Sequence, residues 1–168
     1  MAMQYDVKAA TLLTSGFLVK FRTRVKGISV KGTASAGAVE LFDTVTAPVA
    51  AKYARSGTTI TVTENGHGLL AGQTIGISFG SAGGASATSG NYVIATADTN
   101  TFTLTDINSG TVAADTDCIY ATKWIVTFRF ADGDVYTNYW NIPGEGILAE
   151  NGVYAVMTNL NATSIFYG

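Results

Sequence analysis

The sequence predicts an all-β protein, an antiparallel and jelly-roll-like β-sandwich that is interrupted by a small inserted β domain. The composition favours strands and tight turns over helices, because 24 Thr, 19 Gly, 8 Tyr and 8 Phe accompany only 2 Pro and few Glu, Lys or Gln. Short runs in which apolar and polar residues alternate recur along the whole chain. The charge distribution divides the 168 residues into three segments, 1–56, 57–121 and 122–168.

The first segment carries most of the basic residues and contains three predicted strands. Residues 17–26 alternate from Val19 onward and predict one strand, which is followed by strands at 27–31 and 38–42. A short helix is predicted only at 47–55. Because residues two apart share one face of a strand, the strand at 17–26 would present a row of four positive charges: Lys20, Arg22, Arg24 and Lys26.

The middle segment, residues 57–121, is predicted to be a separate β module. It contains no Lys or Arg but five acidic residues, and a low-complexity loop of Gly, Ser, Ala and Thr spans residues 80–90. Four short strands are predicted in it, at 58–63, 74–79, 91–95 and 100–105.

The last segment predicts further strands joined by tight turns. The dipeptides Asp132-Gly133 and Asn151-Gly152 are both typical of hairpin turns. The predicted strands are at 124–130, 134–137, 153–157 and 164–167. Neither flank would bury a sufficient core alone, so residues 1–56 plus 122–168 are predicted to form one sandwich body that residues 57–121 interrupt.

Two parts of the chain resemble a known class of proteins. The middle segment contains, in order, Asn65-Gly66-His67-Gly68-Leu69, Gly72-Gln73, Gly90-Asn91-Tyr92-Val93 and Asn100-Thr101-Phe102-Thr103-Leu104. This arrangement resembles small β modules that recur in structural proteins of tailed bacteriophages. The flanks, with the pattern Ile142 to Leu148 and the ending Ile165-Phe166-Tyr167-Gly168, are similar to compact β proteins of marine phage virions. The resemblance implies a virion structural protein without catalysis, present in many copies.

The sequence offers little support for a catalytic function. The single histidine, His67, is the only possible imidazole base. Gly76, Ser78 and Gly80 spell the G-x-S-x-G letters of a hydrolase elbow, but they stand in a strand followed by a loop rather than between a strand and a helix. We therefore predict no catalytic residues and no enzyme.

The sequence offers equally little support for a metal site or a cofactor site. One cysteine excludes an internal disulfide and a multi-thiolate site, and Cys118 is predicted to be a small buried hydrophobic residue. The pairs Asp115/Asp117 and Asp132/Asp134 could contact a cation such as Ca²⁺, but two carboxylates are too few for a site. Turn and solubility roles are predicted instead, with no metal and no cofactor.

Two groups of residues are candidates for binding a partner. The basic row Lys20, Arg22, Arg24 and Lys26 could face solvent, an acidic protein surface or nucleic acid. Nucleic acid is disfavoured, because the net charge is −2 and no nucleic-acid-binding motif occurs. The second group could pack in the core, anchor a protein interface or stack on a sugar: Tyr136, Tyr139 and Trp140.

The sequence thus predicts a non-catalytic virion protein, a capsid decoration or cement subunit that binds the major capsid protein or other virion proteins. A homo-oligomer is expected, with a trimer favoured. A tail, adaptor or fibre-base component and a glycan-binding module are the alternatives. The start of the chain shows no secretory signal and no stretch reaches the roughly 20 apolar residues of a membrane span, so we expect synthesis in the host cytoplasm, location in the virion and no membrane partner.

Overall fold

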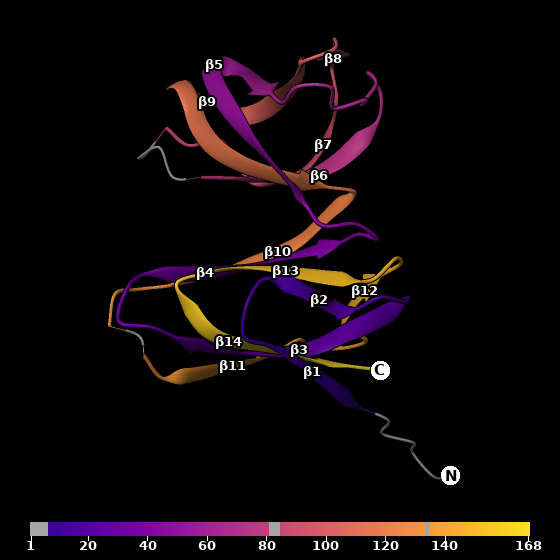
Figure 1. Cartoon of the computed structure of the whole chain (residues 1–168), viewed down its shortest axis with the longest axis vertical. Coiled ribbons are helices and arrows are strands. Elements are labelled where there is room, and N and C mark those ends of the chain that lie inside the picture. Colours follow the sequence, from indigo (N-terminus) through magenta and orange to yellow (C-terminus); the bar gives the residue numbers. More distant parts are fainter. Residues whose placement is uncertain (1–6, 81–84, 134) are drawn as a thin grey trace. The chain divides into compact units, whose positions relative to one another are not determined.

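The computed structural model describes residues 7–80, 85–133 and 135–168. Within these residues every regular element is a β-strand, and the strands pair antiparallel (Figure 1). The all-β prediction is confirmed. The short helix predicted at 47–55 is wrong, because these residues begin the long strand β5 (Val49–Thr63), in which Ala51, Tyr53 and Arg55 alternate inward.

The chain forms two compact units. Unit 1 comprises residues 1–47 and 125–168, and unit 2 comprises residues 48–124. Residues 48–56, which the sequence analysis assigned to the sandwich body, lie in unit 2 because β5 pairs with one neighbour from Val49 onward. Residues 122–124, also assigned to the sandwich body, lie in unit 2 as well, so unit 2 contains Lys52, Arg55 and Lys123 and is less acidic than the segment 57–121 alone.

Unit 1 is a β-sandwich of two sheets, seen as two layers in Figure 1. Sheet A has the order β1 (Lys8–Leu12), β14 (Leu160–Tyr167), β3 (Thr23–Gly32) and β11 (Thr137–Asn141), with β12 (Ile147–Ala149) also on β3. Sheet B has the order β10 (Lys123–Phe130), β4 (Gly37–Asp43), β13 (Val153–Thr158) and β2 (Gly16–Val19). The core between them consists mainly of aliphatic side chains, among them Val25, Ile28, Val30, Val39, Leu41, Val153 and Ile165.

The single strand predicted at 17–26 is wrong. β2 ends at Val19, residues 20–22 form an exposed bend, and β3 begins at Thr23. The bend takes the chain from sheet B to sheet A. The alternation in the sequence continues across the bend through Phe21, but Phe21 is 54% exposed, whereas Val19 and Val25 on either side of the bend belong to the core.

The two dipeptides predicted as hairpin turns also connect the two sheets. β10 belongs to sheet B and β11 to sheet A, so they do not form the hairpin predicted around Asp132-Gly133; Asp134 lies outside the described residues. Asn151-Gly152 likewise joins β12 of sheet A to β13 of sheet B. The buried carboxylate of Asp43 accepts hydrogen bonds from the N–H groups of Glu150, Asn151 and Gly152 at 2.9, 2.7 and 3.3 Å, which fixes this crossing.

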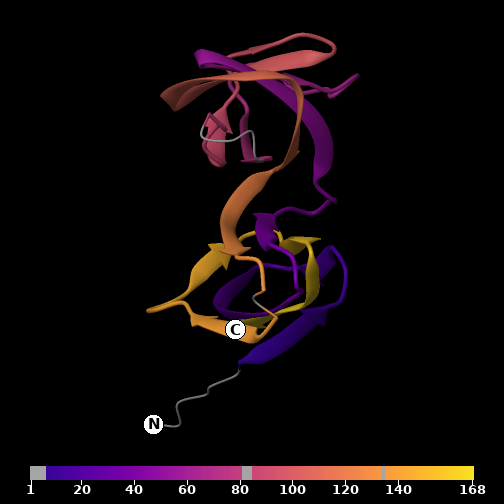
Figure 2. The ribbon, with the colours of Figure 1, turned by 90° about the vertical axis from the view of Figure 1, so that its left-hand side faces the viewer.

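Unit 2 contains one curved sheet, sheet C. Its strand order is β5, β9 (Thr101–Ala121), β6 (Thr74–Phe79) and β7 (Gly90–Val93), with β8 (Thr96–Ala97) also on β9. The strand predicted at 74–79 is confirmed, but β9 continues far beyond the predicted end at 105. β9 curves strongly along its length (Figure 2). β5 pairs with β9 along one edge from Thr101 to Tyr120, while the other edge pairs with β8 at Phe102 and Thr103 and with β6 at the last four residues. The core of unit 2 includes Tyr53, Ile60, Ile77, Phe102 and Leu104.

Candidate functional site

The outer face of sheet A, which points away from the core, is the candidate partner-binding surface. Directly paired residues of neighbouring strands share a face. Trp140 pairs with Ile28, which is fully buried, and this row points inward. The adjacent row, in which Tyr139 pairs with Ser29 and Ser29 with Ser164, therefore points outward.

A β-bulge adds positive charge to this face. Phe166 pairs with Gly27 and Tyr167 with Val25, so Lys26 is the extra residue on β3. Val25 is fully buried, and Arg24 beside it is only partly buried on the outer side. We name the outer residues that combine charge and aromatic surface the cationic–aromatic face: Arg24, Lys26, Lys31, Tyr139 and Phe166.

The aromatic part of this face lies over small residues. The Tyr139 ring is 58% exposed and packs edge-to-face on Phe166 with 5.4 Å between ring centroids. A Cβ added at Gly27 would lie 3.0 Å from the Tyr139 hydroxyl, so glycine at this position lets the Tyr139 ring lie against the sheet. One acidic group approaches the face: a Glu145 carboxylate oxygen is 3.9 Å from Nε of Arg24. The balance of charge on the face is positive.

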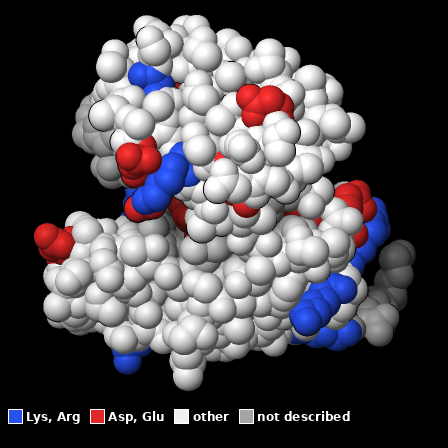
Figure 3. Space-filling view, turned by 45° about the horizontal axis from the view of Figure 1, so that its top comes forward, with Lys and Arg blue, Asp and Glu red and all other residues white. Residues whose placement is uncertain are grey.

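The row of four positive charges predicted on one strand does not exist. Lys20 and Arg22 lie in the bend between β2 and β3. Nζ of Lys20 is 4.9 Å from the centre of the Phe17 ring, and Nε of Arg22 donates to Glu150 at 2.6 Å. Only Arg24 and Lys26 of the predicted row share a face. Charged groups on the surface seen in Figure 3 form small, separate groups on a largely uncharged background.

The predicted aromatic trio is also divided. Tyr136 is 76% exposed and precedes β11, and Tyr139 lies on the outer face. Trp140 points inward, with its ring 5.2 and 5.3 Å from the rings of Phe128 and Phe130. Because Tyr139 and Trp140 occupy opposite faces of the strand, the three rings do not form one stacking platform for a sugar.

Sequence reasoning missed two members of the cationic–aromatic face. Lys31 was assigned to a strand separate from the basic row, although β3 carries Arg24, Lys26 and Lys31 together. Phe166 was placed in a strand without a known neighbour. Its position beside Tyr139 depends on β14 pairing with β3, which no local pattern specifies.

His67 has a structural role in the turn after β5. Its Nδ1 accepts a hydrogen bond from the N–H of Leu69 at 3.0 Å, and its Nε2 is 3.2 Å from the carbonyl oxygen of Thr101. The ring also packs edge-to-face on Phe102. Since a carbonyl only accepts, the proton lies on Nε2 in this arrangement. Both ring nitrogens are thus engaged with the backbone.

The G-x-S-x-G letters lie in strand β6, not in a turn between a strand and a helix. Ser78 is buried, and its Oγ is 3.3 Å from Oγ of Ser89. The glycines are explained by packing: a Cβ at Gly76 would lie 1.7 Å from the backbone nitrogen of Trp124, and one at Gly80 would lie 2.6 Å from the carbonyl oxygen of Asp117.

The acidic pair Asp115/Asp117 lies on the exposed part of β9. Asp117 is paired with Nζ of Lys52 at 2.5 Å, and Asp115 has a positive φ of 71°. In the described ranges 7–80, 85–133 and 135–168, no three His, Cys, Asp or Glu side chains are grouped as a metal site would require.

Cys118 is buried in the core of unit 2, as predicted. Burial, aided by the charge of Asp117, raises the pKa of the thiol from 9.0 to about 12. At pH 8 this lowers the thiolate fraction about 1000-fold, so we expect a thiol reagent to label the native protein far more slowly than the urea-unfolded protein. With one cysteine in the chain, the labelling rate measures the opening of unit 2. Rapid, complete labelling of the native protein would contradict this prediction.

The polar network that sequence reasoning missed lies inside unit 2. Arg55 and Asp106 have side chains only 2% and 0% exposed and form an ion pair at 3.3 Å. Arg55 also donates to the carbonyl oxygens of Gly57, Ala85, Ser86 and Asn108. Asp106 accepts from the N–H groups of Thr88 and Asn108. The pair joins β5, β9 and the segment before β7. Because both charges are buried and paired with each other, they are not available to bind a partner at the surface.

Within the described residues, no helix is long and apolar enough to cross a membrane. A comparison with models of known protein families found no match to this sequence, and a search of curated proteins also found none.

Proposed function

We propose that this chain is a non-catalytic structural protein of a virion, a decoration subunit that binds the capsid shell through the cationic–aromatic face of sheet A. The observation that carries the proposal is the combination of Arg24, Lys26 and Lys31 with the exposed Tyr139 ring on one face of sheet A. Aromatic and Arg side chains are enriched at protein interfaces, and positive groups favour an acidic partner.

The surroundings of the side chains that were considered for catalysis also support a structural role. His67 has both ring nitrogens engaged with the backbone, and Ser78 and Cys118 are buried. The sequence motifs of the middle segment resemble modules of tailed-phage structural proteins. A subunit whose role is to add contact area needs a packed body and a face that suits its partner. The two-sheet core of unit 1 and the cationic–aromatic face would serve these two needs. Association into a trimer is part of the same proposal.

Mass spectrometry of purified particles tests the location. We expect this protein at a ratio to the major capsid protein that is near stoichiometric. A ratio of a few per cent would instead favour a tail component, and absence from particles would overturn the proposal.

Substitutions on the cationic–aromatic face test the binding surface. Lys31→Glu and Tyr139→Ala are each expected to weaken binding to particles stripped of this protein by about tenfold. Arg129→Glu is the matched control, since Arg129 is exposed on β10 of sheet B. Sedimentation of particles with labelled protein measures the affinity. Equal losses in Lys31→Glu and Arg129→Glu would show that net charge alone matters and would contradict the assignment of this face.

A further inference from the structure

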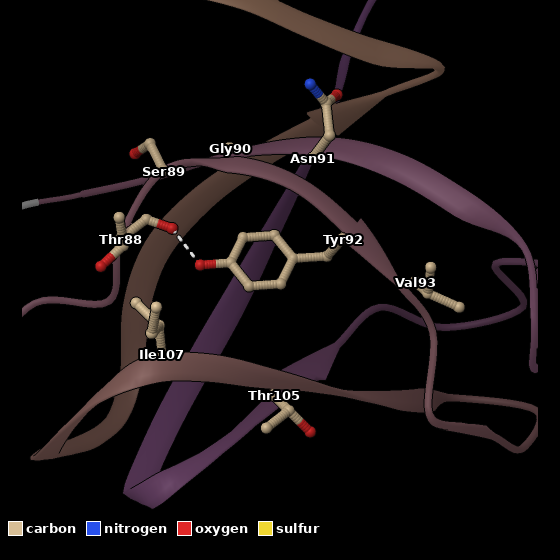
Figure 4. Close-up of a pocket in the computed structure, with 8 residues that line it drawn as sticks. All are labelled: Thr88, Ser89, Gly90, Asn91, Tyr92, Val93, Thr105 and Ile107. Carbon is tan, nitrogen blue, oxygen red and sulfur yellow. Dashed lines mark hydrogen bonds between the residues drawn. The ribbon is translucent and has the colours of Figure 1, made fainter.

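A cleft in unit 2 lies between two strands that do not pair with each other. β7 is the last strand of sheet C in the described part of the chain and pairs with β6 alone. The short strand β8 pairs with β9 only at Phe102 and Thr103. Beyond β8, Thr105 and Ile107 line one side of a cleft whose other side is β7 (Figure 4). The cleft has a volume of about 500 Å³.

The side chains that line the cleft are uncharged, and most of their polar groups are already used. The Tyr92 hydroxyl donates to the carbonyl oxygen of Thr88. The Asn91 amide donates to the carbonyl oxygen of Trp124 and accepts from its N–H, and in Figure 4 it points away from the Tyr92 ring. Ser89 accepts from the N–H of Phe79. Few side-chain groups therefore remain to bind the hydroxyls of a sugar.

Apolar surface remains at the cleft. Ile107 is 89% exposed and Val93 is 60% exposed. The Tyr92 ring lies between the two strands in Figure 4. Burial, with the nearby charge of Asp106, raises the pKa of Tyr92 to about 12, and the hydroxyl donates to the carbonyl oxygen of Thr88. Exposed isoleucine and valine beside an unpaired strand edge are typical of a surface that a partner covers.

We propose that this cleft binds an extended, uncharged peptide segment of a partner protein, which adds to β7 as a further strand. An edge strand offers outward backbone N–H and C=O groups, and these give affinity in strand addition, while pockets give preference for alternate side chains. Here the Tyr92 ring and Ile107 would contact alternate apolar side chains of the peptide, while Val93, the next residue on β7, would contact its opposite face. The absence of charge among the lining residues disfavours charged residues in the segment. This surface lies in unit 2 and does not depend on the proposed capsid-binding face.

A random heptapeptide display library, selected on the full-length chain, tests the proposal. We expect enrichment of peptides in which apolar or threonine residues alternate and charged residues are depleted. A synthetic peptide of the enriched sequence should slow hydrogen exchange of β7 amides. Methylation of alternate backbone nitrogens of that peptide should abolish binding, because it removes the main-chain donors.

Two matched variants decide whether the cleft is the site. Ile107→Asp is expected to weaken binding of the synthetic peptide by at least about tenfold, because it places a charge in the apolar contact. Leu70→Asp is the control, since Leu70 is 66% exposed in unit 2 but does not line the cleft. Failure to enrich any peptide, equal losses in both variants, or binding that survives backbone methylation would each overturn the proposal.

Discussion

Replacing Asp106 by alanine is expected to lower the free energy of unfolding of unit 2 by about 3–5 kcal/mol, because it leaves the buried Arg55 guanidinium without its counter-charge. The Thr88 and Asn108 N–H groups would lose their acceptor at the same time. Urea unfolding followed by the labelling of Cys118 measures the loss in unit 2.

The exposed pair Lys52–Asp117 supplies the control for this substitution. Asp117 also lies on β9 and pairs with a cation from β5, but its side chain is 84% exposed. Asp117→Ala is therefore expected to cost less than about 1 kcal/mol. Similar losses in Asp106→Ala and Asp117→Ala would show that burial of the Arg55–Asp106 pair has no special weight.

The same pair makes the stability of unit 2 depend on pH. Burial alone would raise the pKa of Asp106, but hydrogen bonds from Thr88 and Asn108 and the charge of Arg55 outweigh it and hold the pKa below its ordinary value. The stabilisation is therefore present above the pKa of an unfolded aspartate and is lost as the pH falls through the lowered pKa. We expect Asp106→Asn to lose this acid dependence in urea titrations at successive pH values.

Replacing Gly76 by alanine is expected to destabilise unit 2 by about 3 kcal/mol, at the upper end of the usual cost of overpacking. The added Cβ would lie 1.7 Å from the backbone nitrogen of Trp124 and 2.3 Å from the carbonyl carbon of Lys123. Both are main-chain atoms of unit 2, so relief requires residues 123–124 to move away from β6. Urea unfolding with Cys118 labelling again measures the effect.

Gly90→Ala is the matched control, because Gly90 lies on β7 opposite Ile77 of β6. Its nearest neighbour to an added Cβ is a Tyr92 ring carbon at 3.9 Å, an ordinary contact. We expect a change within about 1 kcal/mol. If Gly76→Ala is tolerated as well as Gly90→Ala, the close approach of residues 123–124 to β6 is not a constraint on the fold of unit 2.

Alternation in the sequence predicted strands well where one face of the strand meets a core. The strand at 74–79 and the part of β5 from 58 to 63 are examples, since Ile75, Ile77, Ile60 and Val62 are all buried. The second half of β9 was not predicted, because residues 107–111 and 113–117 are mostly exposed and lack an apolar face. There, β5 pairs with Gly110, Thr111, Thr116 and Asp117, with a register shift on either side of Arg55, and this pairing does not need a hydrophobic pattern.

Turn chemistry predicted where the chain reverses but not which strands the turn joins. Asn151-Gly152 was read as a hairpin turn, yet it changes sheets because the distant Asp43 binds its backbone. The candidate site has the same limit. A row of charges was read from residues 17–26, but the bend at 20–22 divides it, and Phe166 joins the face only through strand pairing. The contacts of the turn and the residues of the candidate site both depend on contacts between segments far apart in the sequence. A local sequence pattern does not specify such contacts.

The strand order of sheet A implies that the two units can fold at different times during synthesis. Lys8 pairs with Tyr167, and β14 lies between β1 and β3. Sheet A therefore cannot be completed on a ribosome until residues 160–167 have been made, because only β14 joins β1 to β3. Every strand of sheet C lies between Val49 and Ala121, so unit 2 can fold during synthesis. At that stage the first strands of unit 1 have been made, but the later strands that pair with them have not. The high contact order of unit 1 makes it the slower unit to fold and leaves β1 and β3 exposed in the nascent chain.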